Sequence, residues 1–168
     1  MFSKTRISSP PVIAIAAILA TGVAASAVFF KASATAVSED GIIRVKSAYS
    51  VEESVSRMKA DIAAKGIKFF AEIDQGQLAA DADIKLNRST LIEFGNPPLG
   101  TQFITANPNA GLDWPVRLLV TQDDSGNVWA VYTDFAWIAA RHGITNRAAQ
   151  FKMASEVVTS ITSTIRSK

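Results

Sequence analysis

Six residues of this 168-residue chain have the types and positions that a ligand site needs. They are Asp74, Asn96, Pro97, Asp113, Trp114 and His142. Asp74 ends an alternating apolar segment, Asp113 places a carboxylate beside an indole, and His142 is the only histidine. Ligand sites are concave and mostly apolar, with a few convergent polar groups. We therefore expect a pocket near these side chains that holds a small ligand or a partner.

Each of these residues also has a structural interpretation, which the sequence leaves open. An aspartate in the position of Asp74 commonly caps the following turn or helix, and Asp113 is suited to fixing a turn. Asn96 can hydrogen-bond within its own loop, which Pro97 stiffens. His142, next to a glycine, suits the negative end of a helix.

Catalysis ranks third among the interpretations. Asp74 and Asp113 could act as paired carboxylates, or His142 as a base, in a hydrolase or an isomerase. However, a catalytic serine–histidine pair needs an activated serine, and the chain lacks a G-x-S-x-G segment. We therefore assign no catalytic residue.

The composition excludes several kinds of metal and cofactor site. The chain has no cysteine, which excludes disulfides, thiolate zinc sites, iron–sulfur clusters and cysteine catalysis. A single histidine excludes a site built from several histidines. We expect neither a metal nor a cofactor.

The first 36 residues are typical of an export signal. Lys4 and Arg6 precede an apolar run at 12–30, and small residues follow it, with candidate cleavage after Ala27, Ala34 or Ala36. The run is also long enough to serve as an uncleaved membrane anchor. Either reading places the rest of the chain outside the cytoplasm. We therefore expect a periplasmic or secreted protein, with anchoring in the inner membrane as the alternative.

The leader also explains the charge of the chain. The formal net charge is +2, but Lys4, Arg6 and Lys31 all precede Ala36, and no acidic residue does. The remainder has no cluster of basic residues interleaved with aromatic ones, so we expect no nucleic-acid partner. A short linker at 37–41 then leads into one domain at 42–168.

Hydrophobic periodicity predicts an α+β domain with a mostly antiparallel sheet and helices packed on one face. The expected strands cover 42–47, 67–73, 90–94, 116–122 and 128–133, and the expected helices 51–64, 77–83, 135–141 and about 147–166. Ser50 with Glu53 forms a capping box before the first helix. The segment 95–115 is rich in glycine and proline, and we expect a long loop there.

Several segments together resemble the DUF302 family, also called TT1751-like, over about residues 47–143. They are Tyr49-Ser50-Val51-Glu52-Glu53, Lys65-Gly66-Ile67, Phe70-Ala71-Glu72-Ile73-Asp74, Leu91-Ile92-Glu93-Phe94-Gly95-Asn96-Pro97, Leu112-Asp113-Trp114-Pro115-Val116 and Val131-Tyr132-Thr133-Asp134. The resemblance implies a TBP-like β-α-β(4)-α fold and no particular activity. Family members carry histidine where this chain has Gln75, which puts a metal or proton-transfer role there in doubt.

The sequence as a whole favours an exported, non-enzymatic module that binds a small ligand or a partner protein of the cell envelope. The alternative is a structural or envelope-interaction protein that acts as a homodimer by joining exposed sheet edges. Contact with a membrane is expected only through an uncleaved N-terminal segment.

Overall fold

The computed structural model describes residues 40–166. The expected leader, its cleavage sites and residues 37–39 of the linker lie outside the described residues. The elements are β1 (Ile42–Lys46), α1 (Val51–Ala64), β2 (Lys68–Asp74), α2 (Gln75–Asp81), β3 (Ser89–Gly95), α3 (Pro97–Ala106), η1 (Pro108–Asp113), β4 (Val116–Gln122), β5 (Val128–Thr133), α4 (Phe135–Arg141) and α5 (Ala148–Ser163).

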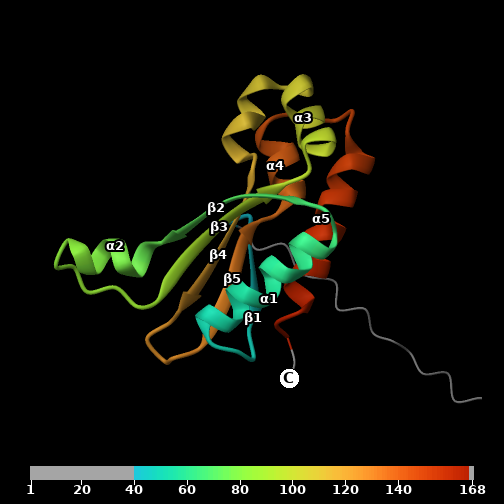
Figure 1. The fold of residues 1–168 in the computed structure, drawn as a ribbon. Coiled ribbons are helices and arrows are strands. Elements are labelled where there is room, and N and C mark those ends of the chain that lie inside the picture. Colours follow the sequence, from blue (N-terminus) through green and yellow to red (C-terminus); the bar gives the residue numbers. More distant parts are fainter. Residues whose placement is uncertain (1–39, 167–168) are drawn as a thin grey trace, which may run out of the picture. The chain divides into compact units, whose positions relative to one another are not determined.

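The five strands form one antiparallel sheet in the order β1-β5-β4-β3-β2 (Figure 1). Its clearest local unit is the β4–β5 hairpin, whose strands have the predicted bounds. Gly126 closes the turn at a φ of +80°, a left-handed conformation that glycine adopts without steric cost. The predicted α+β fold is confirmed.

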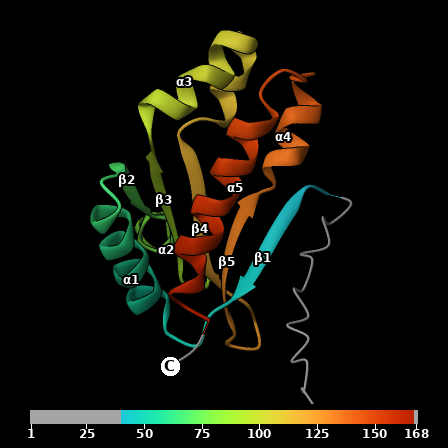
Figure 2. The same ribbon diagram turned by 90° about the vertical axis from the view of Figure 1, so that its right-hand side faces the viewer.

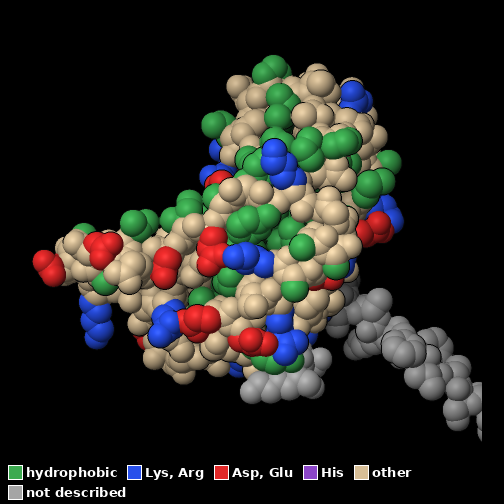
Figure 3. All heavy atoms as spheres, in the orientation of Figure 1, with side chains coloured by type: hydrophobic (Ala, Val, Ile, Leu, Met, Phe, Trp, Pro, Cys, Tyr) green, Lys and Arg blue, Asp and Glu red, His purple; other side chains and the backbone are tan. Residues whose placement is uncertain are grey.

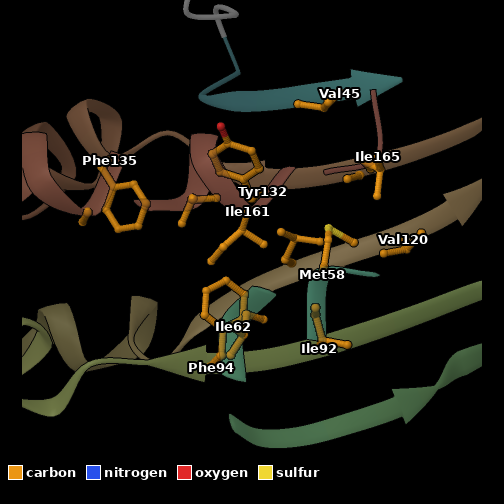
Figure 4. Packing of buried hydrophobic residues seen from close by; sticks show 14 of the residues in the cluster. Val45, Met58, Ile62, Ile92, Phe94, Val120, Tyr132, Phe135, Ile161 and Ile165 are labelled. Carbon is orange, nitrogen blue, oxygen red and sulfur yellow. The ribbon is translucent and has the colours of Figure 1, made fainter. Parts of the chain in front are cut away.

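Helices α1 and α5 cover one face of the sheet (Figure 2). The Ser50 side chain accepts a hydrogen bond from the backbone N–H of Glu53, as the capping pattern predicts. Met58 and Ile62 of α1 pack with Ile161 of α5 over Ile92 of β3 in the buried core (Figure 4). One apolar stripe on each helix therefore encloses the core against one side of the sheet.

The face of the sheet opposite α1 and α5 carries aliphatic side chains from four strands. The strand register places Ile73 opposite Leu91, Leu91 opposite Leu119, and Leu119 opposite Val131. These four side chains are half-buried and form a continuous row across β2, β3, β4 and β5. We call them the aliphatic row. An antiparallel sheet usually shows polar residues on its solvated face, so this row departs from the common pattern.

Helix α2 and the segment after it form an arm that extends from the end of the sheet (Figure 1). Helix α2 begins two residues before the predicted 77–83, because the Asp74 carboxylate caps it by accepting from the N–H of Gln77. None of its residues is buried. Leu78, Ile84 and Leu86 are 59%, 62% and 52% exposed, so the arm adds little to the core.

The expectation of a long loop over 95–115 is wrong. The segment folds into α3 and the short 3₁₀ helix η1, which together lie at one end of the sheet (Figure 1). Pro97 and Pro98 occupy the first turn of α3, where a helix has no use for their missing N–H groups. The prolines that favoured a loop therefore begin a helix.

Candidate functional site

A cavity of about 340 Å³ opens between α3, α5 and the adjoining ends of β2 and β3. Its lining comprises Lys65, Ile67, Phe94, Gly95, Asn96, Leu99, Gly100, Phe103, Trp114, Val116, Phe135, Met153, Ala154, Val157 and Val158. Figure 3 shows hydrophobic side chains gathered on the face where α1, α3 and α5 meet. The volume lies at the lower end of the range for small-molecule sites, roughly 300–1,000 Å³.

The indole of Trp114 forms one wall of this cavity and needs two glycines beside it. A Cβ atom on Gly100 would lie 1.7 Å from Trp114 Nε1, and one on Gly95 would lie 3.0 Å from it. Phe70 contacts the indole edge to face, with ring centroids 5.7 Å apart. The close approach of α3 and β3 to the indole therefore depends on residues without side chains.

The two polar residues of the lining, Lys65 and Asn96, belong to segments that lie near the same end of the β2–β3 ladder. Lys68 pairs with Gly95 in the β2–β3 ladder, so the chain around Ile67 lies across from Asn96. Lys65, the C-cap residue of α1, lies two residues before Ile67 in the chain. Lys65 Nζ donates to both carboxylate oxygens of Asp61, at 2.6 and 2.5 Å. The rest of the lining is almost entirely apolar.

Asn96 and Pro97 differ from the expected polar loop. Asn96 is the N-cap of α3, yet its side chain makes no capping hydrogen bond. The next two residues are prolines and have no N–H, and the N–H of Leu99 already donates to the Asn96 carbonyl. The helix therefore offers a ligand no cluster of free amides, and the Asn96 amide stays available.

Asp113 and His142 contact each other and are not among the residues that line the cavity. His142 Nε2 lies 2.6 Å from Asp113 Oδ2, and the two side chains are only 5% and 6% exposed. Arg141 Nη1 donates to both Asp113 oxygens at 3.2 Å. Arg117 Nη2 lies 3.7 Å from the same carboxylate. These contacts join η1 to the end of α4, and Asp113 directly precedes the Trp114 wall.

Asp74 does not line this cavity. It pairs with Thr90 at the opposite end of the β2–β3 ladder and lines a polar cleft with Glu52 and Arg88. Next to it, Gln75 accepts a hydrogen bond from the Ser89 hydroxyl. The structure thus brings Asn96 and Trp114 to one cavity. Pro97 begins α3 without lining the cavity, and Asp113, His142 and Asp74 also lie outside its lining.

The geometry separates the two carboxylates of the catalytic interpretation. Asp74 and Asp113 lie at opposite ends of the sheet, so they do not form a carboxylate pair. The His142 ring bonds to Asp113 and to no side-chain hydroxyl between residues 40 and 166. Across that same range, no three metal-binding side chains of His, Asp or Glu come together.

Sequence reasoning missed most of the cavity lining. Leu99 and Phe103 were hidden by the expectation of a loop, while Met153 and Val157 flank the apolar stripe of α5. The available signal was the width of that stripe, which exceeds what one sheet face needs.

In the part of the chain that the structure describes, no helix has the length and apolar character to cross a membrane.

Comparisons with known proteins agree on the domain. The family model described as "Domain of unknown function DUF302" matches residues 43–166. A crystal structure of an uncharacterised conserved DUF302 protein from Bacillus stearothermophilus has a TM-score of 0.68 at 12% identity, covering 75% of this chain and 98% of that one. This likeness shows the fold.

Two curated relatives carry the name of an ion channel. Proteins named "Fluoride-specific ion channel FluC 1", from Brucella suis and Brucella abortus, are each 38% identical over 106 residues, or 63% of this chain. The match spans only 42% and 39% of their own lengths.

Proposed function

The chain belongs to the DUF302 family, a domain of unknown function, and from this premise we propose that it is a non-enzymatic module that binds a small, largely apolar molecule. The observation that carries the proposal is the apolar cavity beside Trp114. It combines a volume of about 340 Å³ with an aromatic and aliphatic lining and two polar residues, Lys65 and Asn96. This is the composition of ligand pockets in general.

A fluorescence titration of the full chain with phenylnaphthylamine, an uncharged apolar dye, tests the proposal. We expect saturable enhancement of the dye in the wild type. Val157→Phe places a ring in the cavity from a half-buried position and should abolish most of the enhancement. Leu78→Gln, which removes an exposed aliphatic side chain from the α2 arm, is the matched control. Equal enhancement in the wild type and Val157→Phe contradicts the proposal.

We further propose that the domain acts outside the cytoplasm and beside a membrane. The basic and apolar leader in the sequence supports export, and the channel name of the Brucella relatives supports a membrane setting. Fractionation of cells that produce the full chain, with N-terminal sequencing of the product, tests this. Mature protein that begins after Ala27, Ala34 or Ala36 indicates cleavage, and an intact N-terminus in the membrane fraction indicates anchoring. Recovery in the cytoplasm contradicts both.

A structural homodimer is the second candidate, and the aliphatic row favours it. Covering these four half-buried side chains with a second copy removes apolar surface from water, which is the main favourable term in association. Leu119→Glu at the centre of the row should convert a dimer into a monomer in light scattering. Leu112→Glu, at an exposed position outside the row, should not. A wild-type chain that is monomeric at high concentration rules this candidate out.

A further inference from the structure

We infer that the ligand of the cavity is an amphiphile with an anionic head, of the carboxylate class, whose tail fills the apolar interior while Lys65 and Asn96 hold the head. This inference rests on the proposed function and specifies the ligand of the same site. It follows from the placement, the charge and the unused hydrogen-bonding capacity of the two polar lining side chains.

The polar side chains are placed for one head group. The pairing of Lys68 with Gly95 brings the Lys65–Ile67 connection and Asn96 to the same end of the β2–β3 ladder. The remaining lining residues are apolar and include Phe103 of α3 and Val158 of α5. A ligand that satisfies both regions is therefore polar at one end and apolar along the rest.

The charge of the lining selects the sign of the head. Lys65 is the only charged residue among those that line the cavity, and no carboxylate lines it. The Lys65 side chain is 33% exposed and is paired with the carboxylate of Asp61, which is not among the lining residues. A cationic head would meet a like charge there, whereas a carboxylate would meet an ammonium group.

Both groups retain hydrogen-bond donors for the ligand. The Lys65 ammonium has three N–H groups, and its recorded acceptors are the two oxygens of Asp61. The Asn96 amide makes no capping bond, because the two prolines after it have no N–H to offer. One charged donor and one neutral donor thus remain for the two oxygens of a carboxylate. Charge-assisted hydrogen bonds of this kind are about twice as strong as neutral ones.

Calorimetric titration of the full chain with decanoate, decanol and decylamine, all below their micelle concentrations, tests the inference. The three molecules share one tail, so differences in their affinities report the contribution of the head group. We expect decanoate to bind about tenfold more tightly than decanol, and decylamine to bind most weakly. Lys65→Met should remove the advantage of decanoate and leave decanol binding unchanged, and Lys65→Arg should restore part of the advantage. Lys59→Met is the matched control, because Lys59 also lies on α1 and pairs with a carboxylate, that of Glu72.

The outcomes distinguish this inference from the proposed function. Equal binding of decanoate and decanol, or tightest binding of decylamine, overturns the anionic head while the apolar cavity stands. A decanoate advantage that survives Lys65→Met overturns the role of Lys65. If none of the three molecules binds, or if Val157→Phe leaves their binding unchanged, the proposed function itself fails. Melting temperatures of the unliganded variants show whether each still folds.

Discussion

The carboxylate of Asp113 and the imidazole of His142 form a buried hydrogen bond of 2.6 Å that joins two segments 29 residues apart. Asp113 ends η1 and stands next to Trp114, while His142 caps the end of α4. The His142 carbonyl in turn accepts from the Asn107 side chain at 2.8 Å. Two residues that the sequence suggests separately as catalytic candidates are thus joined in a contact that links η1 to the end of α4.

Removing the Asp113 charge should destabilise the protein. Asp113→Asn leaves the buried His142 ring with a weaker partner and Arg141 without its carboxylate, and losing a hydrogen bond to a charged group costs about 2 kcal/mol. Urea unfolding measures the loss, and Asp124→Asn, at an exposed turn position, serves as the control. In a double-mutant cycle, His142→Gln should add much less in the Asp113→Asn background than in the wild type. Additive effects would show that the pair is not coupled.

A methyl group on Gly100 should disturb the cavity wall. The Cβ of Gly100→Ala would lie 1.7 Å from Trp114 Nε1, so the indole must move, and overpacking of this kind costs about 1–3 kcal/mol. Gly111→Ala is the control, since its Cβ would meet nothing closer than 3.9 Å. Chemical denaturation measures the loss of stability, and the near-ultraviolet circular dichroism of tryptophan reports the movement of the indole. The prediction fails if both variants unfold at the same urea concentration.

Local patterns predicted most elements of the fold, because their signals lie within a few residues. The alternation in 116–122 and 128–133, with Gly126 in the turn between them, specifies the β4–β5 hairpin without knowledge of the rest. The Ser50 cap and the stripe through Met58 likewise specify α1. In these segments, local preference and tertiary packing point to the same structure.

Segment 95–115 shows where local reasoning fails. Its proline and glycine content indicates a loop, but α3 forms because Phe103 stacks on Phe151 of α5, with ring centroids 4.2 Å apart. Most helical stability comes from such tertiary packing and not from propensity. The Asp113–His142 contact was equally inaccessible, since no periodicity relates the two positions. The cavity therefore became visible only once α3 was placed against α5.

The hairpin turn should lose stability in acid through Asp123. Its carboxylate accepts from Trp129 Nε1 and from the Asn127 side chain and backbone, and these bonds lower the pKa of Asp123 below its usual 3.8. A carboxylate whose pKa is lower in the folded than in the unfolded state stabilises the fold at pH values above its unfolded-state pKa. This stabilisation is lost as the pH falls through the folded-state pKa. The unfolding free energy of Asp123→Asn should therefore depend less on pH below about pH 4 than that of the wild type. Asp124→Asn controls for removal of a charge from the same turn, and parallel profiles for Asp123→Asn and the wild type would contradict the assignment.

Alanine substitution of the N-cap residues Ser50 and Asn96 should lower the unfolding free energy by different amounts. Ser50→Ala removes the hydrogen bond from the Glu53 N–H at 3.2 Å and should cost about 1 kcal/mol of unfolding free energy. Asn96→Ala should cost less than about 0.5 kcal/mol, because its side chain makes no capping bond and the prolines after it leave no donor unpaired. The same Asn96→Ala variant should weaken decanoate binding about threefold to tenfold, since it removes a neutral donor to the head group. Urea unfolding and calorimetric titration of both variants give the two readouts. A large loss of stability in Asn96→Ala would show that this amide supports α3, and it would then no longer be free to bind a ligand.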